Sequence, residues 1–202
     1  MARYTGVMPN GGSIATRVIG SPLGELQLAA TDRGACAVRF PPHEPRAADG
    51  PNARAANGSQ AMLEWLAREV KDYFAGRLQQ FTIPVDQAGT EFQRRSWAEL
   101  CRIHFGEIIT YAELARRIGS ENGFRAVGAA NGANKVAIVV PCHRVVASNG
   151  TLGGYGGEVW RKRWLLEHER RVAGMPPLDL FEMKLPGEES AETSEESSFE
   201  RA

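Results

Sequence analysis

The chain has 202 residues, 43% of them hydrophobic and 24% charged, which is ordinary for a globular protein of one large or two small domains. No apolar run approaches the roughly 20 residues that cross a bilayer, and the first residues lack the apolar stretch of a signal peptide, so we expect no membrane association. Three cysteines without a C-x-x-C pair, and four scattered histidines, predict a cytoplasmic protein with no disulfide framework and no metal site.

The formal net charge of zero conceals an uneven distribution. Residues 179–202 contain eight acidic and two basic residues, whereas residues 90–171 contain 13 basic and eight acidic ones. A basic excess on a small domain suits a polyanion such as DNA, although a solvated charged surface has the same composition. The last segment, residues 174–202, has a composition typical of disorder.

The first half of the chain, residues 1–86, predicts a small α+β domain. Three short β-rich runs separated by turns come first, at residues 13–20, 23–30 and 35–40. A helix is expected over residues 60–75 with Ser59 as its N-cap and Gly76 at its end, and a further strand over residues 81–85. Nothing in this half suggests chemistry.

The second half predicts a series of short helices. Thr90 with Gln93 forms a capping-box pattern that opens a helix to about residue 104, and Thr110 with Glu113 opens another over residues 111–118. After a Gly-bounded turn, a third helix is expected over residues 124–131. Two short helices joined in this way are typical of a helix-turn-helix, but also of helical proteins that do not bind DNA.

The third helix carries mostly small side chains. Ala126 and Gly128 allow either a neighbouring helix or another surface to approach closely, and Arg125 at the start of the helix favours nucleic acid.

In the sequence Pro141-Cys142-His143-Arg144, a residue with a thiol directly precedes one with an imidazole. The apolar run at residues 136–140 predicts a strand leading into this sequence, and a Gly-rich loop at residues 149–157 follows it. A nucleophilic cysteine needs a nearby base or positive charge to become a thiolate, and both are present.

A last helix is expected over residues 160–171. On it, Lys162 and Glu169 share a face with apolar residues. A charged residue on such a face normally has a partner, so either the two form a solvated salt bridge or Glu169 orients a histidine.

Together these motifs resemble the O6-alkylguanine-DNA alkyltransferase family over about residues 13–171. Residues 139–146 match the active-site signature of that family, Tyr155-Gly156-Gly157 its substrate loop, and residues 124–128 its recognition helix with an arginine finger. The resemblance implies an α+β fold, with an N-terminal ribonuclease H-like α/β domain followed over residues 87–173 by a mainly helical helix-turn-helix (winged-helix-like) alkyltransferase domain.

The resemblance also implies the reaction. A monomer would bind double-stranded DNA, extrude O6-alkylguanine from the stack and transfer the alkyl group irreversibly to Cys142. O4-alkylthymine would be a further substrate, and no cofactor would be needed. Glu169 would orient His143, which would deprotonate the thiol through a water molecule, while Tyr111 and Lys162 would neutralise the leaving guanine.

The other residues assigned by the resemblance hold the substrate or the DNA. The substrate residues are Asn134, Val145, Tyr155, Gly156 and Gly157, and the DNA residues are Arg125, Ala126, Gly128 and Tyr111.

Three alternatives compete with this interpretation. Alkyltransferase-like proteins recognise lesions without transfer, but they usually have Trp where this chain has Cys142. A cysteine hydrolase using Cys142 and His143 would turn over many times and would need an oxyanion hole. The third alternative is that Cys142 has a purely structural role, which is the expectation for Cys36 and Cys101 as core residues.

Overall fold

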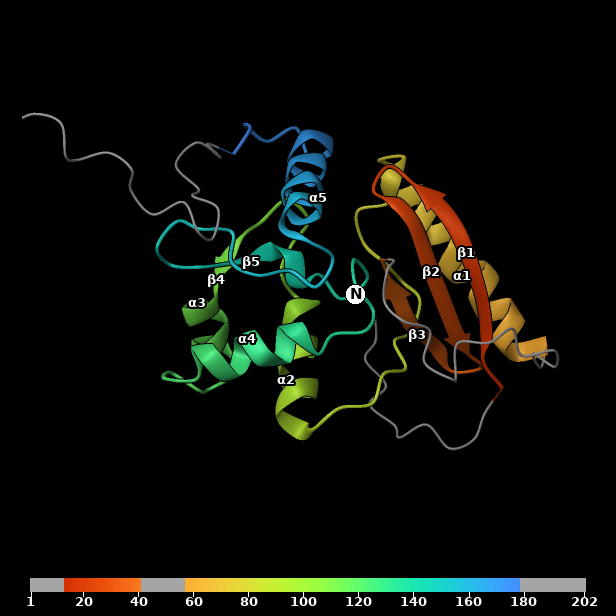
Figure 1. Cartoon of the computed structure of the whole chain (residues 1–202), viewed down its shortest axis with the longest axis horizontal. Helices are drawn as coiled ribbons and strands as arrows, with labels where there is room; N and C mark the ends of the chain where they lie inside the picture. Colours follow the sequence, from red (N-terminus) through yellow and green to blue (C-terminus); the bar gives the residue numbers. More distant parts are fainter. Residues whose placement is uncertain (1–12, 41–56, 179–202) are drawn as a thin grey trace, which may run out of the picture.

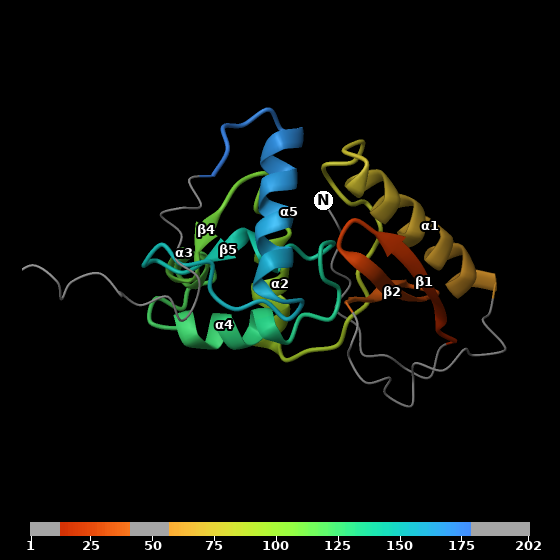
Figure 2. The same ribbon diagram turned by 45° about the horizontal axis from the view of Figure 1, so that its top comes forward.

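The computed structural model describes residues 13–40 and 57–178. The acidic segment at residues 179–202, including most of the predicted disordered tail, lies outside the described residues. Figures 1 and 2 show two neighbouring units, a small sheet with one helix and a mainly helical unit that contains the C-terminal helix α5. None of the described helices is both long and apolar enough to span a membrane.

The N-terminal unit is built on three antiparallel strands in the order β1-β2-β3. They are β1 (Ala15–Ser21), β2 (Gly24–Thr31) and β3 (Gly34–Arg39). The three β-rich runs of the sequence are thus confirmed. Gly34 has φ +152°, and a side chain there would clash with the backbone of Pro84, so the turn into β3 requires glycine.

Helix α1 (Asn57–Phe74) packs against this sheet. Its core face is formed by residues with helical spacing, namely Leu63, Leu66, Ala67, Val70 and Tyr73. The helix begins before Ser59, which is therefore a buried helical residue and not the predicted N-cap. The predicted end is correct, since Gly76 follows with φ +72°.

The strand predicted at residues 81–85 is wrong. Only Val85 forms an isolated bridge, to Ala35 of the sheet. The amide of Ala35 donates to the Pro84 carbonyl at 2.8 Å, and the amide of Asp86 donates to the Ala35 carbonyl at 2.8 Å. Because Pro84 has no amide hydrogen, the pairing does not extend along the segment.

The C-terminal unit contains four helices and a two-stranded parallel sheet within the described residues. The elements are α2 (Glu91–Leu100), β4 (Ile109–Thr110), α3 (Tyr111–Arg117), α4 (Phe124–Gly132), the 3₁₀ turn η1 (Cys142–Arg144), β5 (Val145–Val146) and α5 (Val159–Val172). Helices α3 and α4 contact each other and both contact α2, as expected of a helix-turn-helix.

The capping predictions for this unit are confirmed in part. Both hydrogen bonds of the capping box between Thr90 and Gln93 are present. Thr110 accepts from the amide of Glu113, but the Glu113 carboxylate binds Arg116 and Arg117 and does not return to the cap. Helix α2 ends at residue 100, earlier than expected, because the following residues tighten into i→i+3 turns.

The two units are joined at the edge strand β3. The amide of Val38 donates to the Lys135 carbonyl at 2.9 Å, and the amide of Ala137 donates to the Val38 carbonyl at 3.1 Å. The strand predicted at residues 136–140 is therefore wrong beyond Val136, because the chain leaves the sheet edge at Ile138, which has φ +72°. The N-terminal sheet thus fixes the segment that leads into Cys142.

Candidate active site

Two tight turns present the cysteine. In the first turn, the amide of Val139 donates a hydrogen bond to the Ala137 carbonyl, and in the second, the amide of Cys142 donates to the Val140 carbonyl, both at 2.8 Å. A positive φ is costly for a β-branched residue such as Ile138, so the surrounding contacts must impose it. Cys142 then begins η1 with only 8% of its surface exposed.

Asn134 connects these turns to the thiol. Its side-chain amide donates to the Val140 carbonyl at 2.9 Å and to the Cys142 Sγ at 3.3 Å. Its carbonyl oxygen accepts from the amide of Val136 at 3.0 Å and from the side chain of Gln87 at 3.2 Å. The predicted role of Asn134 in holding the substrate stays a prediction; its contacts connect Val136, before the two turns, with Val140 and Cys142.

Glu169 is the centre of a buried polar network behind the cysteine. Its carboxylate is fully buried and lies 2.8 Å from His143 Nε2. It also accepts from Arg144 Nε at 2.8 Å and Nη2 at 2.9 Å, from the Tyr73 hydroxyl at 2.8 Å and from the amide of Gly106 at 3.0 Å. Tyr73 comes from α1, so the N-terminal unit contributes directly to this network.

The protonation states of this network follow from burial and charge. Burial opposes ionisation of Glu169, but the charges and hydrogen bonds of His143 and Arg144 hold its pKa well below the usual range. Burial lowers the pKa of His143, so the imidazole is neutral at pH 7. An ionised carboxylate can only accept, so we assign the ring proton to Nε2, which leaves Nδ1 as a lone-pair acceptor.

The thiol itself is protonated at rest. Burial raises the pKa of Cys142, while the hydrogen bond from Asn134 and the charge of Lys162 act in the opposite direction. Within the described residues, Nδ1 of His143 has no hydrogen-bond partner. A neutral base with a free lone pair is therefore adjacent in sequence to a thiol that must lose its proton before it can react.

Lys162 places a positive charge near the cysteine. Its Nζ donates to the Val145 carbonyl at 2.6 Å and to the Leu152 carbonyl, and it lies 5.7 Å from the centre of the Tyr111 ring. Burial lowers the pKa of Lys162 to about 8. The Val145 carbonyl, which the resemblance assigns to the substrate, is thus already a hydrogen-bond acceptor for Lys162.

Two adjoining hollows open beside Cys142. One, of about 510 Å³, lies between β3 and the substrate loop, with Phe40 and Tyr155 in its walls. The other, of about 420 Å³, extends toward Tyr111 and Gly128. Cys142, Asn131, Gly132, Tyr155 and Gly156 line both hollows.

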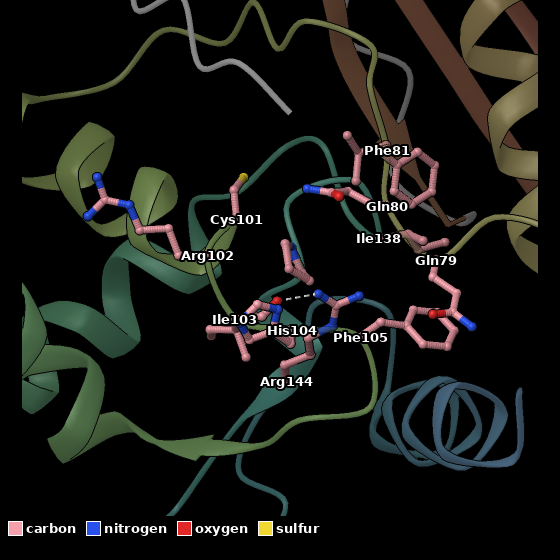
Figure 3. A pocket seen from close by; sticks show the side chains of 12 residues that line it. Gln79, Gln80, Phe81, Cys101, Arg102, Ile103, His104, Phe105, Ile138 and Arg144 are labelled. Carbon is pink, nitrogen blue, oxygen red and sulfur yellow. Dashed lines mark hydrogen bonds between the residues drawn. The ribbon is translucent and has the colours of Figure 1, made fainter. Parts of the chain in front are cut away.

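A separate cavity of about 330 Å³ lies behind the turn and does not include Cys142 (Figure 3). Arg144 lines it and donates to the Ile103 carbonyl at 2.6 Å. Cys101 also lines it; this residue is half-buried and packs against the hydrophobic core, and Cys36 is half-buried as well. Burial raises the pKa of Cys101 to about 11, which makes it a poor nucleophile.

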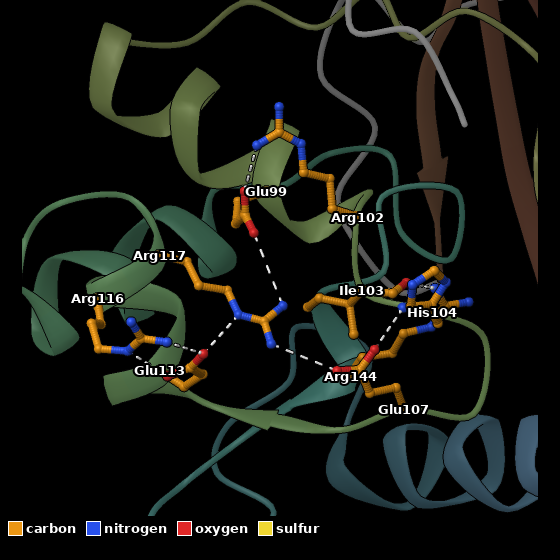
Figure 4. Close-up of polar contacts among 9 residues, drawn as sticks. All are labelled: Glu99, Arg102, Ile103, His104, Glu107, Glu113, Arg116, Arg117 and Arg144. Atoms are coloured by element: carbon orange, nitrogen blue, oxygen red, sulfur yellow. Dashed lines mark hydrogen bonds and ion pairs between the residues drawn. The ribbon is translucent and has the colours of Figure 1, made fainter.

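Helix α3, the first helix of the predicted helix-turn-helix, is held by an ion-pair network (Figure 4). Arg117 on α3 lies 2.8 Å from Glu113, 3.6 Å from Glu107 and 4.0 Å from Glu99 of α2. This network connects α3 to α2 and to the segment before β4.

On α4, Arg125 and Ala126 are exposed and outside the linings of both hollows, whereas Gly128 lines one of them. The structure thus places Arg125 on the surface and Gly128 at the pocket.

Sequence reasoning missed two residues of the buried network. It noted Arg144 only as a positive charge near the thiol, whereas the side chain neutralises Glu169. It expected no chemistry in the N-terminal half, whereas the hydroxyl of Tyr73 on helix α1 reaches Glu169. A tyrosine on an otherwise apolar stripe was the available signal, because a buried hydroxyl needs a partner.

Comparison with known proteins agrees with this geometry. Two family models match, "6-O-methylguanine DNA methyltransferase, ribonuclease-like domain" over residues 14–87 and the DNA binding domain of the same family over residues 91–171. The chain belongs to this family. The named domains also agree with the predicted α+β fold of a ribonuclease-like domain followed by a DNA-binding one.

Individual relatives carry the same description. The methylated-DNA–protein-cysteine methyltransferase of Mycolicibacterium paratuberculosis is 44% identical over 161 residues, which is 78% of this chain and 93% of the relative. The enzyme of that name from Salmonella typhimurium is 51% identical over 105 residues, 52% of this chain and 61% of the relative. The crystal structure of Mycobacterium tuberculosis OGT in complex with DNA matches with a TM-score of 0.70 and 39% identity, covering 83% of this chain and 98% of that one.

Proposed function

We propose that this family member repairs alkylated DNA by accepting the alkyl group of O6-alkylguanine on Cys142. The observation that carries the proposal is the position of the thiol, which lies between two hollows and is adjacent in sequence to a neutral His143 whose Nε2 is held by Glu169. A base stacked in a duplex cannot reach a cysteine that is only 8% exposed, so the damaged nucleotide must leave the helix.

The chemical step is a transfer between carbon, oxygen and sulfur. The Cys142 proton passes to His143 Nδ1 by way of a water molecule, and the ionised Glu169 stabilises the resulting imidazolium. The Sγ lone pair then forms a bond to the alkyl carbon while the bond from that carbon to O6 breaks, and its electron pair remains on guanine. The product thioether has no easy hydrolytic route back to a thiol, so each molecule acts once.

The leaving guanine acquires negative charge, and two side chains are placed to offset it. Burial, and then the nearby Cys142, raises the pKa of Tyr111, so its hydroxyl keeps a proton that it can donate. Lys162 is held by two carbonyls with its charge near Cys142 and Tyr111. A fixed charge in a site with little water stabilises a developing anion more than the same charge in bulk water.

DNA is bound by the C-terminal unit. We infer that Arg125 enters the duplex in place of the extruded nucleotide, because it is exposed at the start of a helix whose small residues, Ala126 and Gly128, allow close approach. The Tyr155-Gly156-Gly157 segment walls the pocket. We further propose that O4-alkylthymine is a second substrate. The protein would act as a monomer in the cytoplasm.

Intact-protein mass spectrometry tests it directly. The protein is incubated with duplex DNA that contains one O6-methylguanine, and we expect a stoichiometric gain of one methylene on a peptide that contains Cys142. Cys142→Ser should abolish the gain, whereas the matched control Cys101→Ser should keep it, because Cys101 lies outside both hollows. Multiple turnovers per protein molecule would indicate a hydrolase, and methylation of another residue would refute the assignment of Cys142.

A further inference from the structure

Arg161, near the start of α5, contacts both structural units at once. Its Nε donates to the Leu23 carbonyl in the turn between β1 and β2 at 3.1 Å, and its Nη1 donates to the Gly157 carbonyl at the end of the substrate loop at 3.0 Å. Its side chain is only 13% exposed. A planar guanidinium with several donors can hold two carbonyls in fixed directions, whereas a lysine ammonium cannot reproduce that fork.

Phe40, directly after β3, forms the second part of the same contact. The Arg161 guanidinium lies 4.9 Å from the centre of the Phe40 ring, which meets Tyr155 edge-on with a centroid distance of 6.2 Å. A side chain at position 157 would lie 2.5 Å from Phe40, so Gly157 is pressed against this ring. The end of the substrate loop is therefore held between α5 and the N-terminal sheet.

The surfaces joined in this way are the walls of the hollow of about 510 Å³ beside Cys142. Phe40 lines it on the side of the sheet, and Tyr155 and Gly157 line it on the side of the loop. The width of the hollow thus depends on how closely the loop is held to Phe40. Two carbonyl contacts fix the loop to α5, one from Lys162 to Leu152 and one from Arg161 to Gly157.

We propose that Arg161 is a positioning residue that pins the substrate loop to the N-terminal sheet and thereby limits the size of the O6-alkyl group that fits. This inference rests on the proposed transfer to Cys142. Loss of Arg161 removes one of the two hydrogen bonds that α5 side chains make to the loop, so the wall formed by Tyr155 and Gly157 can move away from Phe40. The wider hollow then admits bulky alkyl groups more easily. A methyl group already fits, so the extra space does not help its transfer and removes a wall that it contacts.

The test compares single-turnover transfer rates from duplex DNA that carries either O6-methylguanine or O6-benzylguanine. In Arg161→Ala we expect the ratio of benzyl to methyl transfer to rise about tenfold, the scale on which a pocket discriminates between apolar groups of different size. Arg161→Lys should give a smaller rise in the same direction. The matched control, Arg171→Ala, removes the same charge from the other end of α5 and should leave the ratio unchanged.

A second measurement does not depend on transfer. Amide hydrogen exchange in residues 153–157 should be faster in Arg161→Ala than in the unmodified protein and in Arg171→Ala. An unchanged substrate ratio in Arg161→Ala would overturn the proposal, whether or not the exchange becomes faster. If exchange is faster in Arg161→Ala but no protein, including the unmodified one, accepts an alkyl group, the result would support the contact and refute the proposed function.

Discussion

Replacing Glu169 by glutamine tests the buried network behind Cys142. The substitution keeps the size of the side chain, removes its charge and replaces an acceptor oxygen with an NH₂ group that faces donors. Arg144, whose side chain is only 7% exposed, loses its counter-charge. Breaking a buried ion pair in this way costs about 3–5 kcal/mol of unfolding free energy.

The loss is large enough to measure by thermal unfolding. For a chain of this length, each kcal/mol shifts the melting temperature by about 2–4 °C, so Glu169→Gln should melt about 10 °C lower at pH 7. The rate of alkyl transfer should fall about 100-fold, because His143 loses the carboxylate that fixes its tautomer. The matched control is Glu167→Gln, an exposed residue on the same helix, which should change neither quantity.

The pH dependence supplies a further check on the charge. The pKa of Glu169 is lower in the folded state than its unfolded value of about 4.3, so its stabilisation is complete above that value and is lost as the pH falls toward the folded pKa. The difference in stability between the two proteins should therefore shrink below pH 4. A loss under about 1 kcal/mol at pH 7, the value of an ordinary hydrogen bond, would refute the reasoning.

Three further predictions concern the same site. Asn134→Ala should slow transfer about tenfold in single-turnover assays, since it removes the donor that lowers the pKa of Cys142. The transfer rate should be nearly constant from pH 7 to 8, because His143 is neutral and the Cys142 thiol protonated over that range. It should fall above about pH 8 as Lys162 loses its charge. A tenfold rise in rate per pH unit would instead indicate that a free thiolate reacts. Tyr73→Phe should lower the unfolding free energy in urea by about 1.5–3 kcal/mol, since a buried hydrogen bond to a carboxylate is lost, and an unchanged midpoint would contradict that role.

Local signals explain which elements were predictable. The capping box of Thr90 and Gln93 and the glycine stops at residues 76 and 119 involve neighbours a few residues apart, so the chain itself supplies both partners. The final helix at Val159–Val172 follows from the same kind of local pattern.

Apolar runs without such signals were misassigned. Residues 81–85 and 136–140 are rich in β-branched side chains, yet only Val85 and Val136 pair with the sheet. Whether a run becomes a strand depends on an edge that another part of the chain supplies.

The site, too, was predictable only where the signal lies within a short stretch of sequence or a known motif. The adjacent Cys142 and His143 led to the proposed nucleophile and base, and the resemblance supplied Glu169, which the structure places 2.8 Å from His143. The partners that keep Glu169 ionised and aligned were not predictable, because Tyr73 and Arg144 are separated from it by 96 and 25 residues.

The sequence by itself determined the family, the cysteine proposed to react and the helices, because short-range patterns and motif spacing encode all three. Only the tertiary structure decided how the two units share the site. Tyr73 reaches the buried carboxylate from α1, Phe40 forms a pocket wall, and β3 fixes the segment before the cysteine. These contacts join residues far apart in the chain, and they form because a buried charge needs partners and a sheet edge needs pairing, wherever in the sequence those groups occur.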